Sequence, residues 1–239
     1  LYKVTSADVA KLNAADIIFY SGLHLEGKMT DTLERMGKKK PVFPVAEYLK
    51  PNQVLSDEEK HPDPHVWFDV ELWSAVAQTI GDALAMYDPA NAATYKKNTE
   101  TYRAELAKLH DETRKKIGEL PKDKRVLITS HDAFRYFGRA YDVEVKGIQG
   151  ISTDTEASLR EINELVDFIV TRKVKAVFVE TSVNQRNMKS LQEGCKSRGH
   201  DVALGGELFS DAMGKEGTPE GTYIGMIRHN VDTFVKALK

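Results

Sequence analysis

The feature that most constrains the fold is a long helical segment in the middle of the chain, at residues 89–120. It has no glycine before Gly118 and no proline after Pro89, and proline suits the first turn of a helix. Its less polar residues recur at helical spacing: Tyr95, Tyr102, Leu106, Leu109, Thr113 and Ile117. Such a helix would span roughly 45 Å. We expect a rigid helix that connects two lobes; the alternative is a long packing helix within one domain.

Short apolar runs alternate with helical patterns on both sides of this segment. Before it, we expect strands at residues 16–20 and 41–46 and helices at 6–15, 29–36 and 71–87. After it, we expect strands at 125–129, 143–148, 175–180 and 201–204, and helices at 133–141, 156–171, 184–198 and 222–238. This alternation is typical of parallel sheets covered by helices. The sequence predicts an α/β fold with an N-terminal lobe (1–88), a connecting helix (89–120) and a C-terminal lobe (121–239).

The two lobes are unequal in their predicted strands. A two-stranded parallel sheet is too small to form a lobe alone, and the chain opens at Leu1 without a methionine. We therefore expect the first lobe to be N-terminally truncated. The alternative is that its strands join the other sheet.

Composition and missing motifs exclude several classes of function. The net charge of −2 gives no basic footprint for nucleic acid, and no apolar run approaches the length of a membrane span. Cys195 is the only cysteine, which excludes an internal disulfide and a cysteine-based zinc site. The chain lacks a Gly-x-Gly-x-x-Gly motif, a Walker loop, a Gly-x-Ser-x-Gly elbow and His-Glu-x-x-His.

Residues 61–69 read His-Pro-Asp-Pro-His-Val-Trp-Phe-Asp and bring two imidazoles and two carboxylates together. The prolines stiffen the backbone and favour extended conformations. Since alternate side chains of an extended segment point the same way, we expect His61, Asp63 and His65 to converge. Preorganised donors beside an apolar wall suit a metal site. The alternative is a proline-rich turn with solvated histidines.

Two further candidates follow strands of the C-terminal half. His131 comes after the strand at 125–129, and Asp211 comes after the strand at 201–204 and a glycine bend at 205–206. Ligands of open α/β sheets bind beyond the carboxyl ends of the strands, and imidazole with carboxylate suits Zn²⁺, Mn²⁺ or Fe²⁺. The structural alternatives are a capping pair of His131 with Asp132 and an N-cap role for Asp211.

Several motifs occur in an order that resembles a known family. They are Asp-Pro-His-Val-Trp-Phe-Asp at 63–69, Ser-His-Asp-Ala-Phe at 130–134, Phe-Val-Glu-Thr-Ser at 178–182, Gly-Glu-Leu-Phe-Ser-Asp-Ala-Met-Gly at 206–214 and Glu-Gly-Thr-Tyr at 220–223. Together they strongly resemble the metal-binding solute receptors of manganese and zinc ABC transporters, the TroA-like family, over essentially the whole chain. The resemblance implies two α/β lobes joined by one long rigid helix.

The same resemblance implies the metal ligands. They would be His65, His131 and Asp211; some family members carry a glutamate at the site that His131 matches. The remaining family ligand is a histidine that would precede Leu1-Tyr2, so this chain would lack it. His24 and His61 are the candidate substitutes.

The function implied is an extracytoplasmic binding protein, periplasmic or held at the cell surface as a lipoprotein. It would be a monomer without enzymatic activity or nucleic acid, and would hand Mn²⁺ or Zn²⁺ to a membrane ABC permease. We favour Mn²⁺, because zinc-dedicated relatives typically carry a long His-rich loop, whereas residues 50–62 hold one histidine. The rival is a metal-dependent hydrolase with Glu180 or Glu207 as its base. A surface adhesin role is also associated with the family, and no residue pattern here bears on it.

Overall fold

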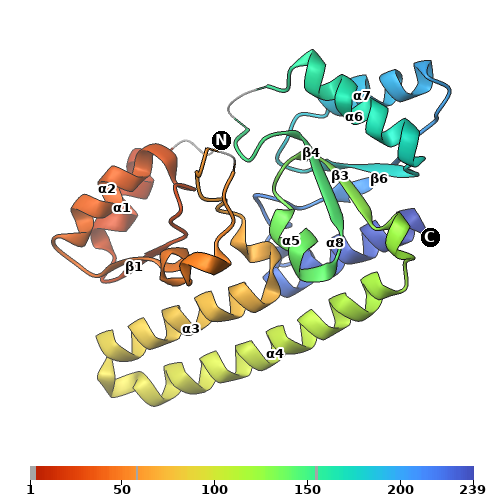
Figure 1. The fold of residues 1–239 in the computed structure, drawn as a ribbon. Coiled ribbons are helices and arrows are strands. Elements are labelled where there is room, and N and C mark those ends of the chain that lie inside the picture. The colour runs from red at the N-terminus through yellow and green to blue at the C-terminus, as the bar shows by residue number, and fades with distance from the viewer. Residues whose placement is uncertain (1–3, 58, 154–155) are drawn as a thin grey trace. The chain divides into compact units, whose positions relative to one another are not determined.

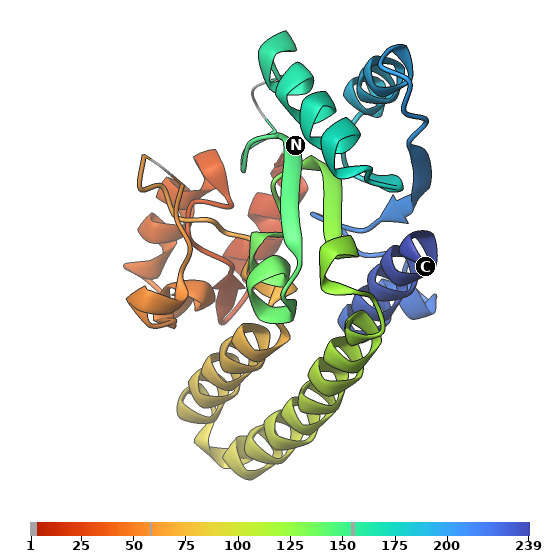
Figure 2. The same ribbon diagram turned by 45° about the vertical axis from the view of Figure 1, so that its right-hand side comes forward.

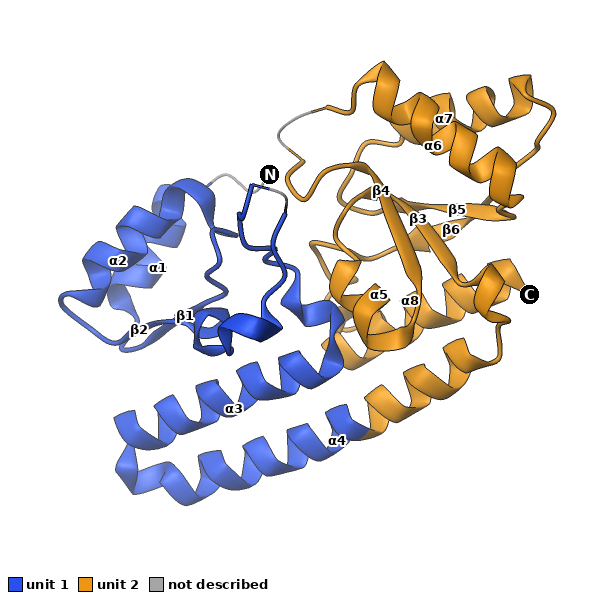
Figure 3. Cartoon of the chain, viewed as in Figure 1, with its two compact units in different colours: residues 1–107 blue, residues 108–239 orange. Residues whose placement is uncertain are grey.

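The structure is a computed structural model that describes residues 4–57, 59–153 and 156–239. The chain divides into two compact units, residues 1–107 and 108–239, coloured separately in Figure 3. The boundary falls inside the long helix α4 (Ala92–Gly118), so each unit contains a part of it. The three-part division at residues 88 and 120 remains a prediction.

The first unit is built from short strands and helices, as the sequence predicts (Figure 1). Its elements are α1 (Ser6–Ala14), β1 (Ile18–Tyr20), α2 (Thr30–Gly37), β2 (Val42–Pro44), α3 (Val70–Tyr87) and the first part of α4. Strands β1 and β2 are parallel, with Ile18 opposite Val42. Thr5 caps α1 in a capping box with Asp8, which satisfies amide groups that the first turn leaves without partners.

Helix α3 packs closely against the first part of α4. A Cβ atom on Gly81 of α3 would lie 2.0 Å from the hydroxyl oxygen of Thr99 on α4. Arg103 of α4 donates hydrogen bonds to Ser74 and Gln78 of α3. The predicted apolar seam of α4 is confirmed, since Leu106, Leu109, Thr113 and Ile117 are all buried. The missing side chain of Gly81 is what lets the two helices approach.

The second unit contains two pairs of parallel strands, with helices on both sides. Its elements are β3 (Val126–His131), α5 (Arg135–Tyr141), β4 (Glu144–Gln149), α6 (Leu159–Arg172), β5 (Ala176–Glu180), α7 (Arg186–Ser197), β6 (Ala203–Leu208) and α8 (Tyr223–Leu238). Parallel pairs form between β3 and β4 and between β5 and β6, and β3 lies beside β5. The spatial order is therefore β4-β3-β5-β6.

Side chains that alternate along the strands form two hydrophobic layers in this unit, one on each side of the strands. Figure 2 shows α6 and α7 on one side of the strands and α8 on the other. The α6/α7 side buries a cluster that includes Ile128, Val177 and the thiol of Cys195. On the other side, Phe178 of β5 and Phe137 of α5 contact Phe234 of α8. By the same alternation, Glu180 of β5, two residues after Phe178, emerges on the α8 side.

The predicted strand ends differ from the structure at the two positions that matter for function. His131 was expected in a loop after residue 129, but β3 continues to His131, which pairs with Gln149 of β4. The predicted bend at Gly205-Gly206 lies inside β6. There a register shift places Val177 opposite Leu204 and Phe178 opposite Gly206, so Gly205 is the extra residue of a β-bulge.

Helix starts also shift by a few residues. Helix α6 begins after Ser158, whose hydroxyl accepts from the Glu161 amide in a capping box, instead of at the predicted residue 156. Helix α8 begins after Thr222 as predicted, and Thr222 caps it. Among the described residues, none of the helices combines the length and apolar character that crossing a bilayer requires.

Candidate metal centre

His131 ends strand β3 and is completely buried. Its backbone N–H donates to Oε1 of Glu180 at 2.9 Å, and its ring Nδ1 lies 2.5 Å from Oε2 of the same carboxylate. Glu180 is the last residue of the neighbouring strand β5 and is also buried. Because β3 and β5 run parallel, their carboxyl ends meet at one edge of the sheet. Glu180 thus fixes the orientation of the imidazole and leaves Nε2 directed elsewhere.

Asp211 lies on the side of the ring that Glu180 does not occupy. Its Oδ1 is 3.4 Å from Nε2 of His131, and about a third of its side chain is exposed (34%). It follows β6 by three residues, on a bend with no helix behind it, so the predicted alternative of an N-cap is wrong. The structure brings together the imidazole and the carboxylate that the sequence predicts as ligands in this unit.

The charges around His131 favour a cation at this point. Burial by itself would lower the pKa of the imidazole, but hydrogen bonding and charge attraction from Asp211 and Glu180 outweigh it and raise the pKa of His131 to about 10. Two carboxylates flanking one ring therefore hold a positive charge between them. A divalent cation bound at Nε2 could take the place of that proton.

His65 belongs to the first unit and has a matching arrangement. Its ring Nδ1 lies 2.7 Å from Oδ1 of Asp63, and its backbone N–H donates to the same oxygen at 3.0 Å. Both residues are buried, and the ring of Trp67 packs edge-on against the imidazole at 5.1 Å. Asp69 then caps α3 through the amides of Glu71 and Leu72. Asp63 orients the ring and leaves Nε2 as the nitrogen for a ligand role.

The expectation that His61 would converge with Asp63 and His65 is wrong. The His61 side chain is exposed and its ring contacts Asp57 at 3.1 Å. The segment does not stay extended, since Lys60 has a positive φ of 67° and Ser56 pairs with Pro62 in an antiparallel bridge. His24, the other proposed substitute, lies exposed in a loop and has a φ of 65°.

The remaining histidines have structural partners. The ring of His110 contacts the Tyr141 hydroxyl at 3.2 Å, and His200 contacts the carbonyl of Val174 at 2.8 Å. His229 contacts the carbonyl of Glu207 at 3.1 Å. These contacts agree with the sequence interpretation, which gave none of the three a ligand role.

Sequence reasoning missed the partner role of Glu180. It was noted only as a possible base at a strand end, together with Glu207, which is exposed. The signal that could have found it is positional: Glu180 ends one predicted strand and His131 follows the end of another by two residues, and the carboxyl ends of parallel strands lie at one edge of a sheet. The hydroxyl pair of Ser182 and Ser210, 2.8 Å apart beside Asp211, was likewise not predicted.

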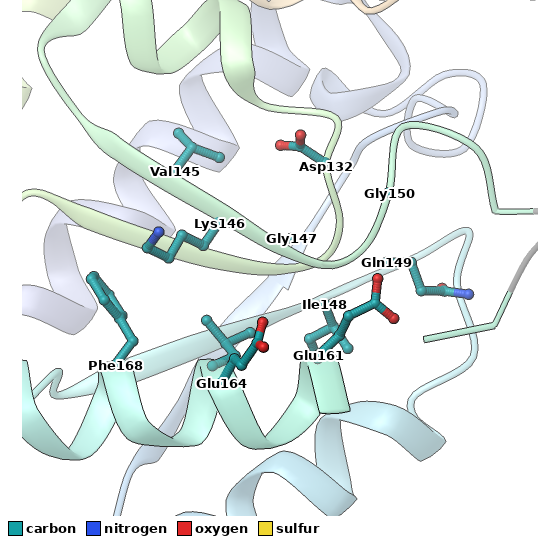
Figure 4. Close-up of a pocket in the computed structure, with 11 residues that line it drawn as sticks. Asp132, Val145, Lys146, Gly147, Ile148, Gln149, Gly150, Glu161, Glu164 and Phe168 are labelled. Atoms are coloured by element: carbon teal, nitrogen blue, oxygen red, sulfur yellow. The ribbon is translucent and has the colours of Figure 1, made fainter. Parts of the chain in front are cut away.

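A cavity of about 400 Å³ lies along β4 (Figure 4). Its lining includes Lys146 and Gly147 of β4 and Glu161, Glu164 and Phe168 of α6. Lys146 stacks on the Phe168 ring at 4.7 Å, and Glu161 and Glu164 are engaged with Ser158 and Arg160. Neither His131 nor Asp211 lines this cavity.

Comparison with known proteins gives matches that extend over this chain. The family model described as "ZnuA: Zinc-uptake complex component A periplasmic" matches residues 1–237. The manganese-binding lipoprotein MntA of Bacillus subtilis is 47% identical over 240 residues, which cover 100% of this chain and 78% of MntA. The zinc-binding protein TroA of Treponema pallidum is 47% identical over 238 residues, covering 100% of this chain and 77% of TroA.

Solved structures agree with the sequence matches. The periplasmic zinc binding protein TroA from Treponema pallidum superimposes with a TM-score of 0.97, covering 100% of this chain and 86% of that chain at 47% identity. A manganese-bound periplasmic metal binding protein from Candidatus Liberibacter asiaticus gives a TM-score of 0.87 at 25% identity, covering 100% of this chain and 87% of that chain.

Proposed function

Because the chain belongs to the family of periplasmic component A proteins of zinc-uptake complexes, we propose that it captures a divalent transition metal ion outside the cytoplasm and delivers it to an ABC permease. The observation that carries this proposal is the preorganised pair of His131 and Asp211. A buried carboxylate fixes the imidazole, and its Nε2 faces an oxygen of Asp211 at 3.4 Å. Nitrogen and oxygen donors at this spacing suit a first-row divalent metal.

His65 is the third ligand in this proposal. Its support is the contact with Asp63, which repeats within the first unit what Glu180 does for His131. A metal-binding histidine usually gives its second nitrogen to a carboxylate in this way. The proposed site therefore draws Nε2 from His65, Nε2 from His131 and oxygen from Asp211.

We favour Mn²⁺ as the transported ion, with Zn²⁺ a close second. Zn²⁺ binds more tightly in almost any mixed nitrogen and oxygen site, so tight Zn²⁺ binding in vitro would not by itself decide the question. Manganese accepts more oxygen donors, and a bidentate Asp211 would supply them. The relatives at 47% identity include both a manganese-binding and a zinc-binding protein.

The proposed setting is the periplasm or the cell surface, as for the named relatives, one of which is described as a lipoprotein and one as periplasmic. The protein would act as a monomer that makes and breaks no covalent bond. The rival hydrolase needs a general base with access to metal-bound water. Glu180 is buried, with both of its oxygens directed at His131, so it is committed to orienting the ring.

Metal binding by single variants tests the proposal. His65→Ala, His131→Ala and Asp211→Ala should each weaken Mn²⁺ and Zn²⁺ binding by at least about tenfold in a competition titration with a chromophoric chelator. His61→Ala and His200→Ala are the controls, because the rings of these histidines contact Asp57 and the carbonyl of Val174, which the proposed site does not use. Unchanged binding in the combined triple variant would overturn the site.

A further inference from the structure

The segment that carries Asp211 is held by helix α8 through one side chain, Asn230. This residue is buried, with 4% exposure. Its Oδ1 accepts from the backbone N–H of Phe209 at 2.9 Å, and its Nδ2 donates to the carbonyl of Phe209 at 2.7 Å. Two antiparallel hydrogen bonds to one residue fix both the position and the rotation of that residue's backbone.

Asn230 makes these hydrogen bonds at the point where the backbone pairing of β6 ends. The amide of Thr181 donates to the carbonyl of Leu208, the last residue of β6, at 3.1 Å. Phe209 comes next and receives its partners from the Asn230 side chain. Only Ser210 lies between Phe209 and Asp211. The side-chain amide therefore continues the sheet's hydrogen bonding toward the proposed ligand.

Neighbouring contacts place the rest of the segment. The Phe209 ring packs edge-on against the ring of His229 at 5.0 Å, and the hydroxyls of Ser210 and Ser182 lie 2.8 Å apart. The Asn230 side chain differs from these contacts because it makes two hydrogen bonds to the backbone of Phe209. A buried amide costs stability unless its partners are present, so any movement of Phe209 away from Asn230 would be penalised.

We propose that Asn230 is a positioning residue that sets the Asp211 carboxylate relative to His131 and thereby favours Mn²⁺ over Zn²⁺. This rests on the proposed function. Zn²⁺ is satisfied by four ligands and tolerates one carboxylate oxygen, whereas Mn²⁺ gains from a carboxylate that presents both oxygens. If Asp211 were less well positioned, the affinity for Mn²⁺ would therefore fall more than the affinity for Zn²⁺.

The test compares Asn230→Ala with Phe234→Leu in the full chain. Phe234 lies one turn further along α8 and packs in the core against Phe137 and Phe178, so its substitution lowers stability without touching the Asp211 segment. Asn230→Ala should weaken Mn²⁺ binding about 10- to 100-fold, weaken Zn²⁺ binding less, and broaden the electron paramagnetic resonance spectrum of bound Mn²⁺. Phe234→Leu should keep the wild-type spectrum and the wild-type ratio of the two affinities.

A double-mutant cycle shows whether Asn230 acts through Asp211. In an Asp211→Ala background, Asn230→Ala should produce no further change in Zn²⁺ affinity. An additional loss there, or an equal loss for both metals in the single variant, would overturn the proposal. If Asn230→Ala fails to fold, Asn230→Asp replaces it, because it keeps the acceptor for the Phe209 amide and exchanges the donor to the Phe209 carbonyl for a carboxylate oxygen.

The outcomes separate this inference from the proposed function. If the wild-type chain binds neither Mn²⁺ nor Zn²⁺, or if Asp211→Ala binds like wild type, the proposed function fails. If the wild type binds and Asp211→Ala does not, but Asn230→Ala matches wild type in both affinities and in its spectrum, only the role of Asn230 is wrong.

Discussion

Glu180 holds His131 at two points, through the backbone N–H at 2.9 Å and through ring Nδ1 at 2.5 Å. Both residues are buried, at 1% and 0% exposure. The carboxylate therefore sets the ring orientation and supplies negative charge behind a proposed metal ligand. Removing that charge has two opposed effects, and their balance can be measured.

Glu180→Gln should weaken metal binding about 10- to 100-fold. The neutral amide would lower the pKa of His131, so that protons would compete less with the metal for the ring. However, the ring would lose the carboxylate that orients it, and the metal would lose a nearby negative charge. We expect the second effect to win. A chelator competition titration gives the affinity and proton NMR of the His131 ring gives the pKa. Glu207→Gln, on the exposed face of β6, is the control and should change neither.

Metal binding should release about one proton at neutral pH. Without metal, the pKa of His131 is raised to about 10, so the ring is protonated at pH 7.5 and must lose its proton to bind metal. Isothermal titration in buffers of different ionisation enthalpy measures the number released. Over this range affinity should rise with pH, and a pH-independent affinity would contradict the assignment.

The same pKa shift predicts how the stability of the metal-free protein depends on pH. Since the folded pKa lies above the ordinary 6.5, the stabilisation by protonated His131 is complete below pH 6.5 and is lost as pH rises through about 10. The free energy of unfolding should therefore decline across that window. A His131→Asn variant should show a flatter profile in urea titrations at several pH values.

Asp63→Asn should weaken metal binding, whereas Asp57→Asn should not. Both aspartates contact a histidine two or four residues later, but Asp63 and His65 are buried while the His61 side chain beside Asp57 is 68% exposed. Only the buried pair can orient a ring without solvent competing for the bond. Equal affinities for the two variants in the same titration would argue against His65 as a ligand.

Gly81→Ala should destabilise the first unit by about 1–3 kcal/mol. The added methyl would lie 2.0 Å from the Thr99 hydroxyl oxygen and push α3 from α4. Gly118→Ala is the matched control: its added Cβ meets no atom within 4 Å, and alanine is the better helix former. Urea denaturation of both variants, with circular dichroism as the signal, checks the difference.

The sequence could predict the class of fold and the ligand candidates because both depend on local patterns. Buried strands show as apolar runs, and His131 and Asp211 follow two of them. What it could not predict depends on pairing between segments far apart in the chain. The extension of β3 to His131 needs Gln149 of β4 opposite it, and the role of Glu180 needs β5 beside β3.

The convergence expected for His61 failed for a related reason. Proline stiffness suggested one extended segment, but the pairing of Ser56 with Pro62 and the positive φ of Lys60 turn the chain before Asp63. This bridge joins residues on both sides of a loop, so the pattern of residues within the loop could not predict it.

The bulge in β6 limits where this protein could be re-engineered as a sensor for another metal. A side chain on Gly205 would collide with the Phe178 ring at 2.6 Å, and one on Gly206 would meet Thr233 at 2.6 Å on a backbone with φ of 138°. Libraries that vary this stretch would lose most members to misfolding. Diversity should instead go to exposed positions beyond Phe209 and the proposed ligand Asp211, such as Met213, whose side chain is 51% exposed.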